Sequence, residues 1–304
     1  MIIREPIDIT FNREKKSFLR KLTPYLFIIP HLIFFLVFVV YPFFYGIIIS
    51  FFKCDLMGTF EYVGFQNYID IFTPGTKFNT DFINGLKHTF LFTIVIVPLI
   101  IIVPLILALW LFAIKNEKIR GIFQAILYST SILSVATVVT LWQCMMAKDY
   151  GLINYLFNTD INWIGEQPTN WIVIFMLTLW AGVGGNMIIF LSAIASIPRS
   201  QYEAANIDGI SKWKQFLRLT LPSLRFPLVY SLVTGTIGAF NVFGQPYMLG
   251  GPVDSNETIM MHIQNYAFGN GTPMAGIASA MSVILGLIIV IVSVIQFKVT
   301  KRDS

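Results

Sequence analysis

Residues 203 to 222 read EAANIDGISKWKQFLRLTLP, a short stretch of mixed charge that lies between two long apolar runs. Two aromatic side chains, Trp213 and Phe216, stand among its charged residues. Aromatic side chains embedded in a polar surface are typical of protein contacts, and the flanking apolar runs put this stretch at the edge of a membrane. The stretch therefore predicts a docking site held at a membrane surface.

The composition of the whole chain indicates an integral membrane protein. Of 304 residues, 56% are hydrophobic and 12% are charged, and the mean hydropathy is +0.71, whereas about a quarter of the residues of a soluble domain are charged. A helix needs about 20 residues to cross roughly 30 Å of hydrocarbon, and several charge-free runs are longer than this. The fold class that we predict is all-α, with six transmembrane helices. Their expected ranges are 25–51, 87–113, 120–146, 171–196, 223–247 and 276–297.

The distribution of Lys and Arg predicts the orientation in the membrane. If the amino terminus is inside, only Lys53, Lys77, Lys87 and Lys148 of the 21 basic residues fall in external segments. Both termini are therefore expected in the cytoplasm. We expect a cytoplasmic segment 1–24, a transmembrane domain 25–297 with a cytoplasmic loop 199–222, and a cytoplasmic tail 298–304. The net charge of +5 is then a topology signal and a contact with anionic lipid, and it gives no reason to expect nucleic acid.

The residues that could carry catalysis are scattered. His31, His88 and His262 fall in separate segments, and Cys54 and Cys144 have no spacing typical of a metal or redox site. The HExxH, GxSxG and GxxxxGK[ST] motifs are absent. We therefore expect a transport protein that is not an enzyme and holds no metal or cofactor, so any energy from ATP must come from a partner.

Neutral polar residues are the informative ones within the predicted spans. No Asp, Glu, Lys or Arg lies deep in any span, which weighs against a proton- or sodium-driven transporter. Amide, hydroxyl and aromatic groups suit a neutral polyhydroxyl ligand. The candidates to face a solute are Thr178, Trp180, Asn186, Asn241 and Gln245. Bonds to the helix backbone or to a neighbouring helix remain the alternative for such residues.

The three external segments are predicted to be ordered caps. In residues 60–72 the apolar side chains recur at roughly helical spacing, which predicts an amphipathic helix on the outer surface. Residues 73–81 are rich in turn formers. Residues 148–170 and 248–275 would form the second and third caps.

The stretch quoted first is predicted to fold as two helices joined by a glycine turn. Residues 202–208 form a short helix that stops at Gly209, since glycine adopts the left-handed conformation after a helix end. Ser211 is placed to cap the next helix, and Pro222 opens the fifth span. From these residues alone, an interfacial helix pair without a partner remains an alternative.

This segment resembles the EAA loop of ABC-importer permeases. The matching positions are Glu203, Ala204, Ala205, Asp208, Gly209, Phe216, Leu219, Leu221 and Pro222. The rest of the chain is similar to the binding-protein-dependent sugar permeases of the maltose and glycerol-phosphate importer type. Stretches that carry the resemblance include FEYVGFQNYIDIF, DYGLINYLF, WAGVGGNMIIFLSAIASIPRSQYEAANIDG and FNVFGQPYMLGGP.

The resemblance implies a type I ABC importer permease fold in a bacterial plasma membrane. It implies a second homologous permease subunit, a dimer of ABC ATPases that bind ATP and Mg, and an extracytoplasmic solute-binding protein. Glu203 and Gly209 would couple ATP hydrolysis to the spans. Sugar contacts would fall in residues 178–186 and 238–245, and the first of these ranges adds Gly182 to the candidate solute-facing residues. The third span, YSTSILSVATVV, departs from the family pattern because it lacks a proline that many relatives carry.

The expected function is therefore that of the permease subunit of an ATP-driven carbohydrate importer. An importer for glycerol phosphate or an amino acid would keep the coupling loop and change the cavity. A secondary transporter is a further alternative, which an intramembrane carboxylate would favour. A polytopic membrane enzyme is disfavoured by the absence of paired carboxylates, a nucleophile or a metal set.

Overall fold

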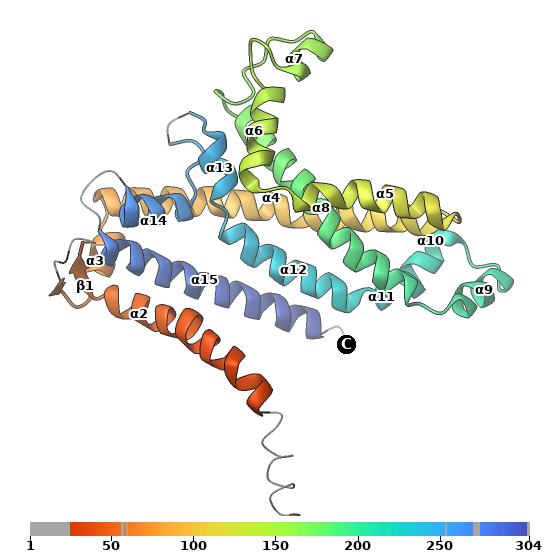
Figure 1. Ribbon diagram of the computed structural model, residues 1–304, viewed down its shortest axis with the longest axis horizontal. Helices are drawn as coiled ribbons and strands as arrows, with labels where there is room; N and C mark the ends of the chain where they lie inside the picture. Colours follow the sequence, from red (N-terminus) through yellow and green to blue (C-terminus); the bar gives the residue numbers. More distant parts are fainter. Residues whose placement is uncertain (1–24, 56–57, 59, 253, 270–273, 303–304) are drawn as a thin grey trace, which may run out of the picture.

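The computed structural model describes residues 25–55, 58, 60–252, 254–269 and 274–302, so the predicted segment 1–24 lies outside the described residues. Long helices run roughly along the longest axis of the molecule (Figure 1). They are α4 (Lys77–Ala113), α8 (Thr169–Ala195), α12 (Arg225–Phe240) and α15 (Ala275–Arg302). Helix α12 packs against both α4 and α15, and α4 also packs extensively against α8. Helix α4 is thus the central element on which the others assemble.

The first helix, Tyr25–Ile49, lies along one side of this assembly and is mostly exposed. It contacts the rest mainly through α2 (Tyr41–Ile49) on α15. A π-helical turn, η1 (Leu36–Val40), precedes α2. Pro42 explains this turn, because proline has no N–H and its ring crowds the carbonyl four residues earlier, so the helix widens there and the Tyr41 N–H bonds to Leu36 O.

Helices are found at all six predicted places, but two of them are interrupted. Four helices of the described chain are long and apolar enough to cross a membrane: Tyr25–Ile49, α4, α8 and α15. A fifth is counted if α5 (Glu117–Ser129), η2 (Thr130–Ile132) and α6 (Val135–Met145) form one broken span, which bends by 100°. Helix α12 has 16 residues and continues after a break as α13 (Gly244–Leu249). The predicted count of six transmembrane helices is therefore not confirmed.

The bend in the third span has a local cause in the sequence. The Ser134 side chain accepts a hydrogen bond from the Thr137 N–H at 3.2 Å, which is the N-cap of α6. A serine that caps a new helix stops the preceding one, so no proline is needed. Next to this bend, α8 approaches α5 closely at Gly184, where an added Cβ would lie 2.7 Å from the Cα of Tyr128. Gly184 therefore serves close helix packing, and α8 itself continues unbroken.

The first external segment differs from the prediction. Strand β1 (Phe52–Cys54) pairs antiparallel with β2 (Phe60–Tyr62), and only α3 (Gln66–Phe72) is helical. The predicted helix over 60–72 is wrong in its first part because Phe52 and Tyr62 pack edge-on across the strands and Gly64 turns the chain at φ +58°. The predicted turn-rich stretch 73–81 is also shorter than expected, since Thr76 caps α4 and the helix begins at Lys77. The later caps contain α7 (Leu152–Phe157) and α14 (Ile259–Phe268).

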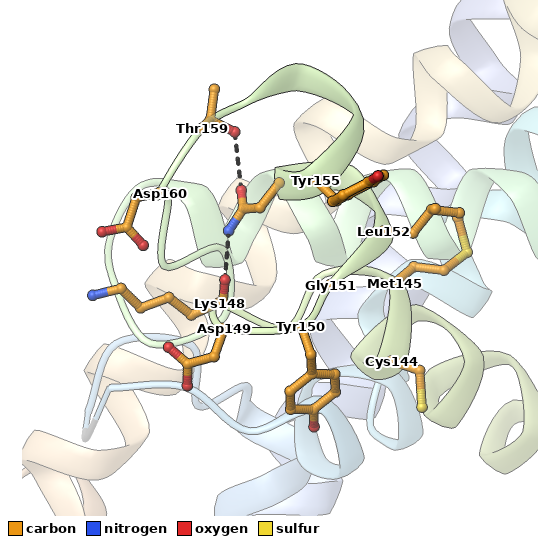
Figure 2. Close-up of a pocket in the computed structure, with 11 residues that line it drawn as sticks. Cys144, Met145, Lys148, Asp149, Tyr150, Gly151, Leu152, Tyr155, Thr159 and Asp160 are labelled. Carbon is orange, nitrogen blue, oxygen red and sulfur yellow. Dashed lines mark hydrogen bonds between the residues drawn. The ribbon is translucent and has the colours of Figure 1, made fainter.

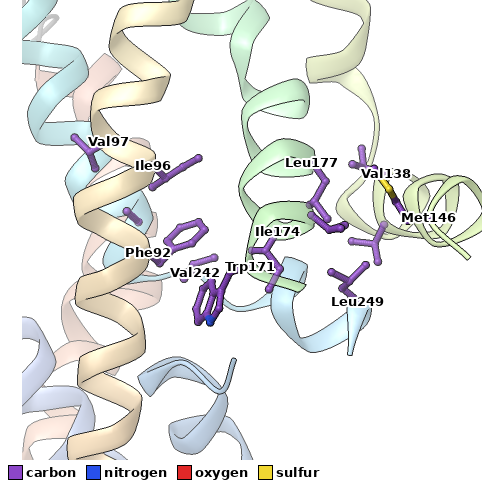
Figure 3. Close-up of a cluster of buried hydrophobic side chains, with 13 residues drawn as sticks. Phe92, Ile96, Val97, Val138, Met146, Trp171, Ile174, Leu177, Val242 and Leu249 are labelled. Carbon is purple, nitrogen blue, oxygen red and sulfur yellow. The ribbon is translucent and has the colours of Figure 1, made fainter. Parts of the chain in front are cut away.

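The main hydrophobic cluster lies where α4, α6, α8 and α13 meet (Figure 3). Trp171 stacks on Phe175, which stacks on Phe92, with ring centroids 5.7 and 5.8 Å apart. Val242, in the break between α12 and α13, and Leu249 join the same cluster. This packing holds the break of the fifth span against α4 and α8, and it positions the pocket described below.

Candidate functional site

The predicted coupling loop folds as two helices joined by a glycine turn. Helix α9 (Arg199–Ile207) ends before Gly209, which has φ +69°. The Ile210 N–H donates to Ala205 O at 2.9 Å, and the Gly209 N–H donates to Asn206 O at 3.1 Å. These bonds close the helix end in the way that glycine makes possible. The chain then returns through α10 (Lys212–Gln215).

A polar bracket that the sequence analysis missed joins the two helices of the loop. Asn206 Oδ1 accepts hydrogen bonds from Lys212 Nζ at 2.9 Å and from Gln215 Nε2 at 2.8 Å. Gln215, which is buried, also donates to Ile210 O at 2.8 Å. Asn206 and Gln215 look like solvated residues in the sequence, and their nine-residue separation matches no helical spacing, so no sequence signal paired them.

The loop exposes most of the residues predicted for coupling. Glu203, Ala204, Asp208, Gly209 and Pro222 are exposed, whereas Ala205 is only 5% exposed and packs inward. The remaining member, Phe216, is half-buried and stacks on Trp213 with ring centroids 5.6 Å apart. The most exposed large apolar side chains of the same loop are Ile207, at 87%, and Trp213, at 68%. Exposed apolar groups ringed by charge are the chemistry of a docking surface.

The second helix of the loop continues into the fifth span through a π-helical turn. Helix α10 runs into η3 (Phe216–Thr220) and α11 (Leu221–Ser223). Pro222 stands in the same relation to η3 as Pro42 does to η1, and the Leu221 N–H bonds to Phe216 O. Ser211 occupies the predicted N-cap position, but its side chain makes no capping bond.

Most of the residues predicted to face a solute come together in one pocket. A cavity of about 370 Å³ lies where α4 and α8 meet the break between α12 and α13. Five of the six predicted positions line it: Thr178, Gly182, Asn186, Asn241 and Gln245. The sixth, Trp180, does not, because its ring packs edge-on against Trp142 with centroids 6.3 Å apart.

The hydrogen bonds of these residues separate structural side chains from an available one. Thr178 donates to Ile174 O at 2.7 Å, and Asn241 donates to Ile237 O at 2.7 Å, so both bond the backbone of their own helix. Asn186 crosses between helices, because Nδ2 donates to Ile100 O at 3.1 Å and Oδ1 accepts from Ser231 at 3.2 Å. Gln245 makes no side-chain hydrogen bond within the described chain. Its whole amide therefore remains available to a ligand, whereas Thr178, Asn186 and Asn241 each already donate to a backbone carbonyl.

The pocket also contains an aromatic face that the sequence analysis did not single out. Phe243 lines the cavity and stacks on Tyr247 of α13, with centroids 4.8 Å apart. Phe92 contributes from α4. The residues that line the pocket are uncharged. The site thus combines an available amide with aromatic and small side chains.

A larger hollow, of about 910 Å³, lies in the segment predicted as the second external cap (Figure 2). Asn154 holds its walls, because Nδ2 donates to Lys148 O at 3.1 Å and Oδ1 accepts from Thr159 at 3.0 Å and from Trp163 Nε1 at 2.8 Å. None of the predicted solute-facing residues lines this hollow. Five of the six predicted solute-facing residues line the smaller pocket instead.

Solved structures with a similar fold include a bacterial ABC transporter involved in the import of the acidic polysaccharide alginate. Its chain has a TM-score of 0.79 and 20% sequence identity, with 95% of this chain and 99% of that chain covered. The alginate transporter in complex with a periplasmic protein that carries an alginate pentasaccharide gives a TM-score of 0.77 at 20% identity, with 95% and 97% covered. This likeness establishes the type I ABC permease fold.

Curated relatives are similar along nearly the whole chain. The arabinooligosaccharides transport system permease protein AraP of Bacillus subtilis is 32% identical over 288 residues, which cover 92% of this chain and 89% of AraP. The lactose transport system permease protein LacF of Rhizobium radiobacter is 29% identical, with 90% and 92% covered. The trehalose/maltose transport system permease protein MalF of Thermococcus litoralis is also 29% identical, with 90% and 92% covered.

A family model matches residues 88–302, the region that contains the broken third span, the coupling loop and the pocket. The model describes the inner membrane component of binding-protein-dependent transport systems. The sequence resemblance, the fold and the full-length relatives all agree with this match. The chain therefore belongs to the family of binding-protein-dependent transport system inner membrane components.

Proposed function

We propose that this chain is the membrane-spanning permease subunit of an ATP-driven importer for carbohydrate, either a sugar or an oligosaccharide. The observation that carries the proposal is the uncharged pocket at the break of the fifth span, which gathers five predicted solute-facing residues. Relatives named for arabinooligosaccharides, lactose and trehalose or maltose support the same ligand class.

The chemistry of the pocket favours a sugar over the other solutes. A phosphate ester or an amino acid carries charge, and a buried charge needs an opposite charge or several strong donors beside it. The pocket offers the Gln245 amide and the Phe243 ring, and no charged side chain lines it. An amide can both donate to and accept from hydroxyls, and an aromatic face packs on the C–H face of a pyranose.

The exposed face of the coupling loop would dock on a partner ATPase. Glu203 supplies charge, and Ile207 and Trp213 supply apolar area, at one end of the helix assembly. In the proposed mechanism, ATP and Mg bind on a dimer of ATPase subunits, whose closure moves the loop and with it the fifth span. Since Asn206 and Gln215 tie the two loop helices together, the loop would move as one body.

The assembly that we propose contains two related permeases around a shared path and a solute-binding protein outside. Alternation between inward-facing and outward-facing states needs only that the solute contacts differ between them. The chain would lie in a bacterial plasma membrane with both termini in the cytoplasm. Segment 1–24 and tail 298–304 would then be cytoplasmic, and 25–297 would form the transmembrane domain.

The test is sugar-stimulated ATP hydrolysis by the complex of this chain with its neighbouring permease, ATPase and binding protein, reconstituted in vesicles. Glu203→Ala is compared with Gln201→Ala, which changes another exposed residue of the same helix. We expect stimulation only with loaded binding protein, a marked loss in the Glu203 variant, and near wild-type activity in the control. Uptake that continues without ATP would refute the proposal.

A further inference from the structure

A buried histidine lies outside the coupling loop and the pocket, at the predicted external end of the molecule. His262 of α14 is 7% exposed and packs against α4 at Gly85. The packing is tight, since a Cβ added at Gly85 would lie 2.7 Å from His262 Cδ2. One turn further along α14, the Tyr266 hydroxyl donates to Asp81 Oδ2 at 2.5 Å. The ring is therefore enclosed between two helices, where water has little access.

Two carboxylates lie at ion-pair distance from the His262 ring without forming a hydrogen bond to it. Nε2 lies 3.5 Å from Glu257 Oε2 and has no hydrogen-bond partner among the described residues. Nδ1 lies 4.0 Å from Asp81 Oδ2, which already accepts the hydrogen bond from the Tyr266 hydroxyl. The other titratable groups that face the ring are His88 of α4 and Asp254. A buried nitrogen without a partner is unusual in proteins and calls for an explanation.

Burial lowers the pKa of His262, and the nearby carboxylates Asp81 and Glu257 offset this only in part. The packed arrangement therefore holds the neutral ring. In any arrangement that hydrates the ring, its pKa returns to about 6.5. The open arrangement then binds more protons than the packed one in mild acid, so the packed one is favoured above pH 6.5 and loses stability as the pH falls below it.

Hydrogen bonds connect the start of α14 to the wall of the pocket. His88 Nδ1 lies 2.9 Å from Glu257 O, and Thr89 Oγ1 accepts from the Ile259 N–H at 3.1 Å, so α4 holds this segment at two points. Thr258 Oγ1 donates to Val242 O at 2.8 Å. Val242 lines the pocket at the break of the fifth span. A shift of α14 relative to α4 would therefore reach the pocket through a short chain of contacts.

We propose that His262 is a proton-operated latch between α14 and α4, which mild acid on the outer side of the membrane releases, loosening the pocket wall at Val242. The latch is a property of this chain's packing and does not depend on which solute the pocket accepts. A protonated ring leaves the enclosed position because hydration stabilises its charge better than two carboxylates that lie 3.5 and 4.0 Å away and form no hydrogen bond to it. The consequence for transport rests on the proposed function.

The test is hydrogen exchange of the α14 amides in the full-length chain, purified with its partner subunits in lipid nanodiscs, at pH 7.5 and pH 5.5. Rates are corrected for the chemical effect of pH on exchange. An open-state pKa of about 6.5 allows protection to fall by up to about 10-fold across this interval. We expect this fall in the wild type and in His31→Gln, a control on the first helix, and a flat response in His262→Gln.

Two results would overturn the latch. One is protection of α14 that stays constant or increases in acid in the wild type, which would mean that the carboxylates hold the protonated ring in place. The other is a His262→Gln variant that loses protection as the wild type does. If this variant does not fold, NMR titration of labelled histidine in the wild type decides, since a His262 pKa of 6.5 or above contradicts the proposal. Hydrogen exchange and NMR titration do not depend on sugar transport, so a failure of the proposed function would not change either result.

Discussion

Replacement of Gly209 by alanine should weaken the coupling loop through the backbone alone. Gly209 has φ +69°, and an added Cβ would meet no atom within 4 Å, so the substitution causes no clash. The remaining cost is that of placing a non-glycine residue in the left-handed region, about 1 to 2 kcal/mol. This corresponds to about a 5- to 30-fold change in the population of the closed turn.

The assay is hydrogen exchange at the Ile210 amide, whose bond to Ala205 O closes the turn. We expect protection there to fall by about 5- to 30-fold in Gly209→Ala, together with a loss of sugar-stimulated ATP hydrolysis. Gly209→Asn should be milder, because asparagine tolerates the left-handed conformation.

Gly75→Ala is the matched control for strain. Gly75 also has a positive φ, +86°, with no atom within 4 Å of an added Cβ, but it lies in the first external segment. Its backbone cost should be similar while ATP hydrolysis stays near wild type. Unchanged exchange at Ile210 in Gly209→Ala, or equal damage from alanine and asparagine, would refute the reasoning.

Three further substitutions test the contacts described above. Asn206→Ala removes the acceptor that joins the two loop helices and should cost about 1 to 3 kcal/mol of local stability, measured by exchange in residues 205–215, and unaltered exchange there would contradict it. Gln245→Leu should raise the sugar concentration for half-maximal uptake by about 2- to 10-fold with little change in basal ATP hydrolysis, whereas Thr178→Val should not, since that hydroxyl bonds its own helix. Asn154→Ala leaves the Trp163 indole N–H without its acceptor and should lower amide protection in residues 148–163 by about 10-fold or more, and wild-type protection would contradict the structural role of Asn154.

The sequence predicted the features that depend on composition and local spacing. Charge-free runs located all six helical regions, and Gly209 located the turn of the coupling loop, because glycine adopts the left-handed conformation after a helix end more readily than other residues. The grouping of Thr178, Asn186 and Gln245 in one pocket followed from resemblance together with the polarity of these residues.

Features that depend on contacts distant in sequence could not be predicted. Hydropathy does not show the direction in which a helix runs. The third span, which bends by 100° at Ser134, was therefore predicted as one continuous helix. Trp180 has the chemistry of a sugar-binding residue, but its position is decided by packing on Trp142, which lies in another helix. The strand that contains Phe60 could not be predicted because its spacing of apolar residues also fits a helix. Only the pairing with Phe52–Cys54 distinguishes the two, and the sequence does not show that pairing.

The π-helical turn at Phe216–Thr220 fixes a phase relation between the surface of the coupling loop and the fifth span. Each residue of an α-helix advances the direction of its neighbours by about 100°, and a π-turn holds one residue more than an α-turn. A deletion of one residue in this turn that restores regular winding would therefore leave Trp213 facing nearly the same way, whereas a deletion that keeps the π-turn would rotate Trp213 by about 100° around the helix axis. Insertions between Lys214 and Pro222 are therefore expected to be far less tolerated than substitutions, because they change where the loop points, whereas one deletion within Phe216–Thr220 can be absorbed by loss of the π-turn.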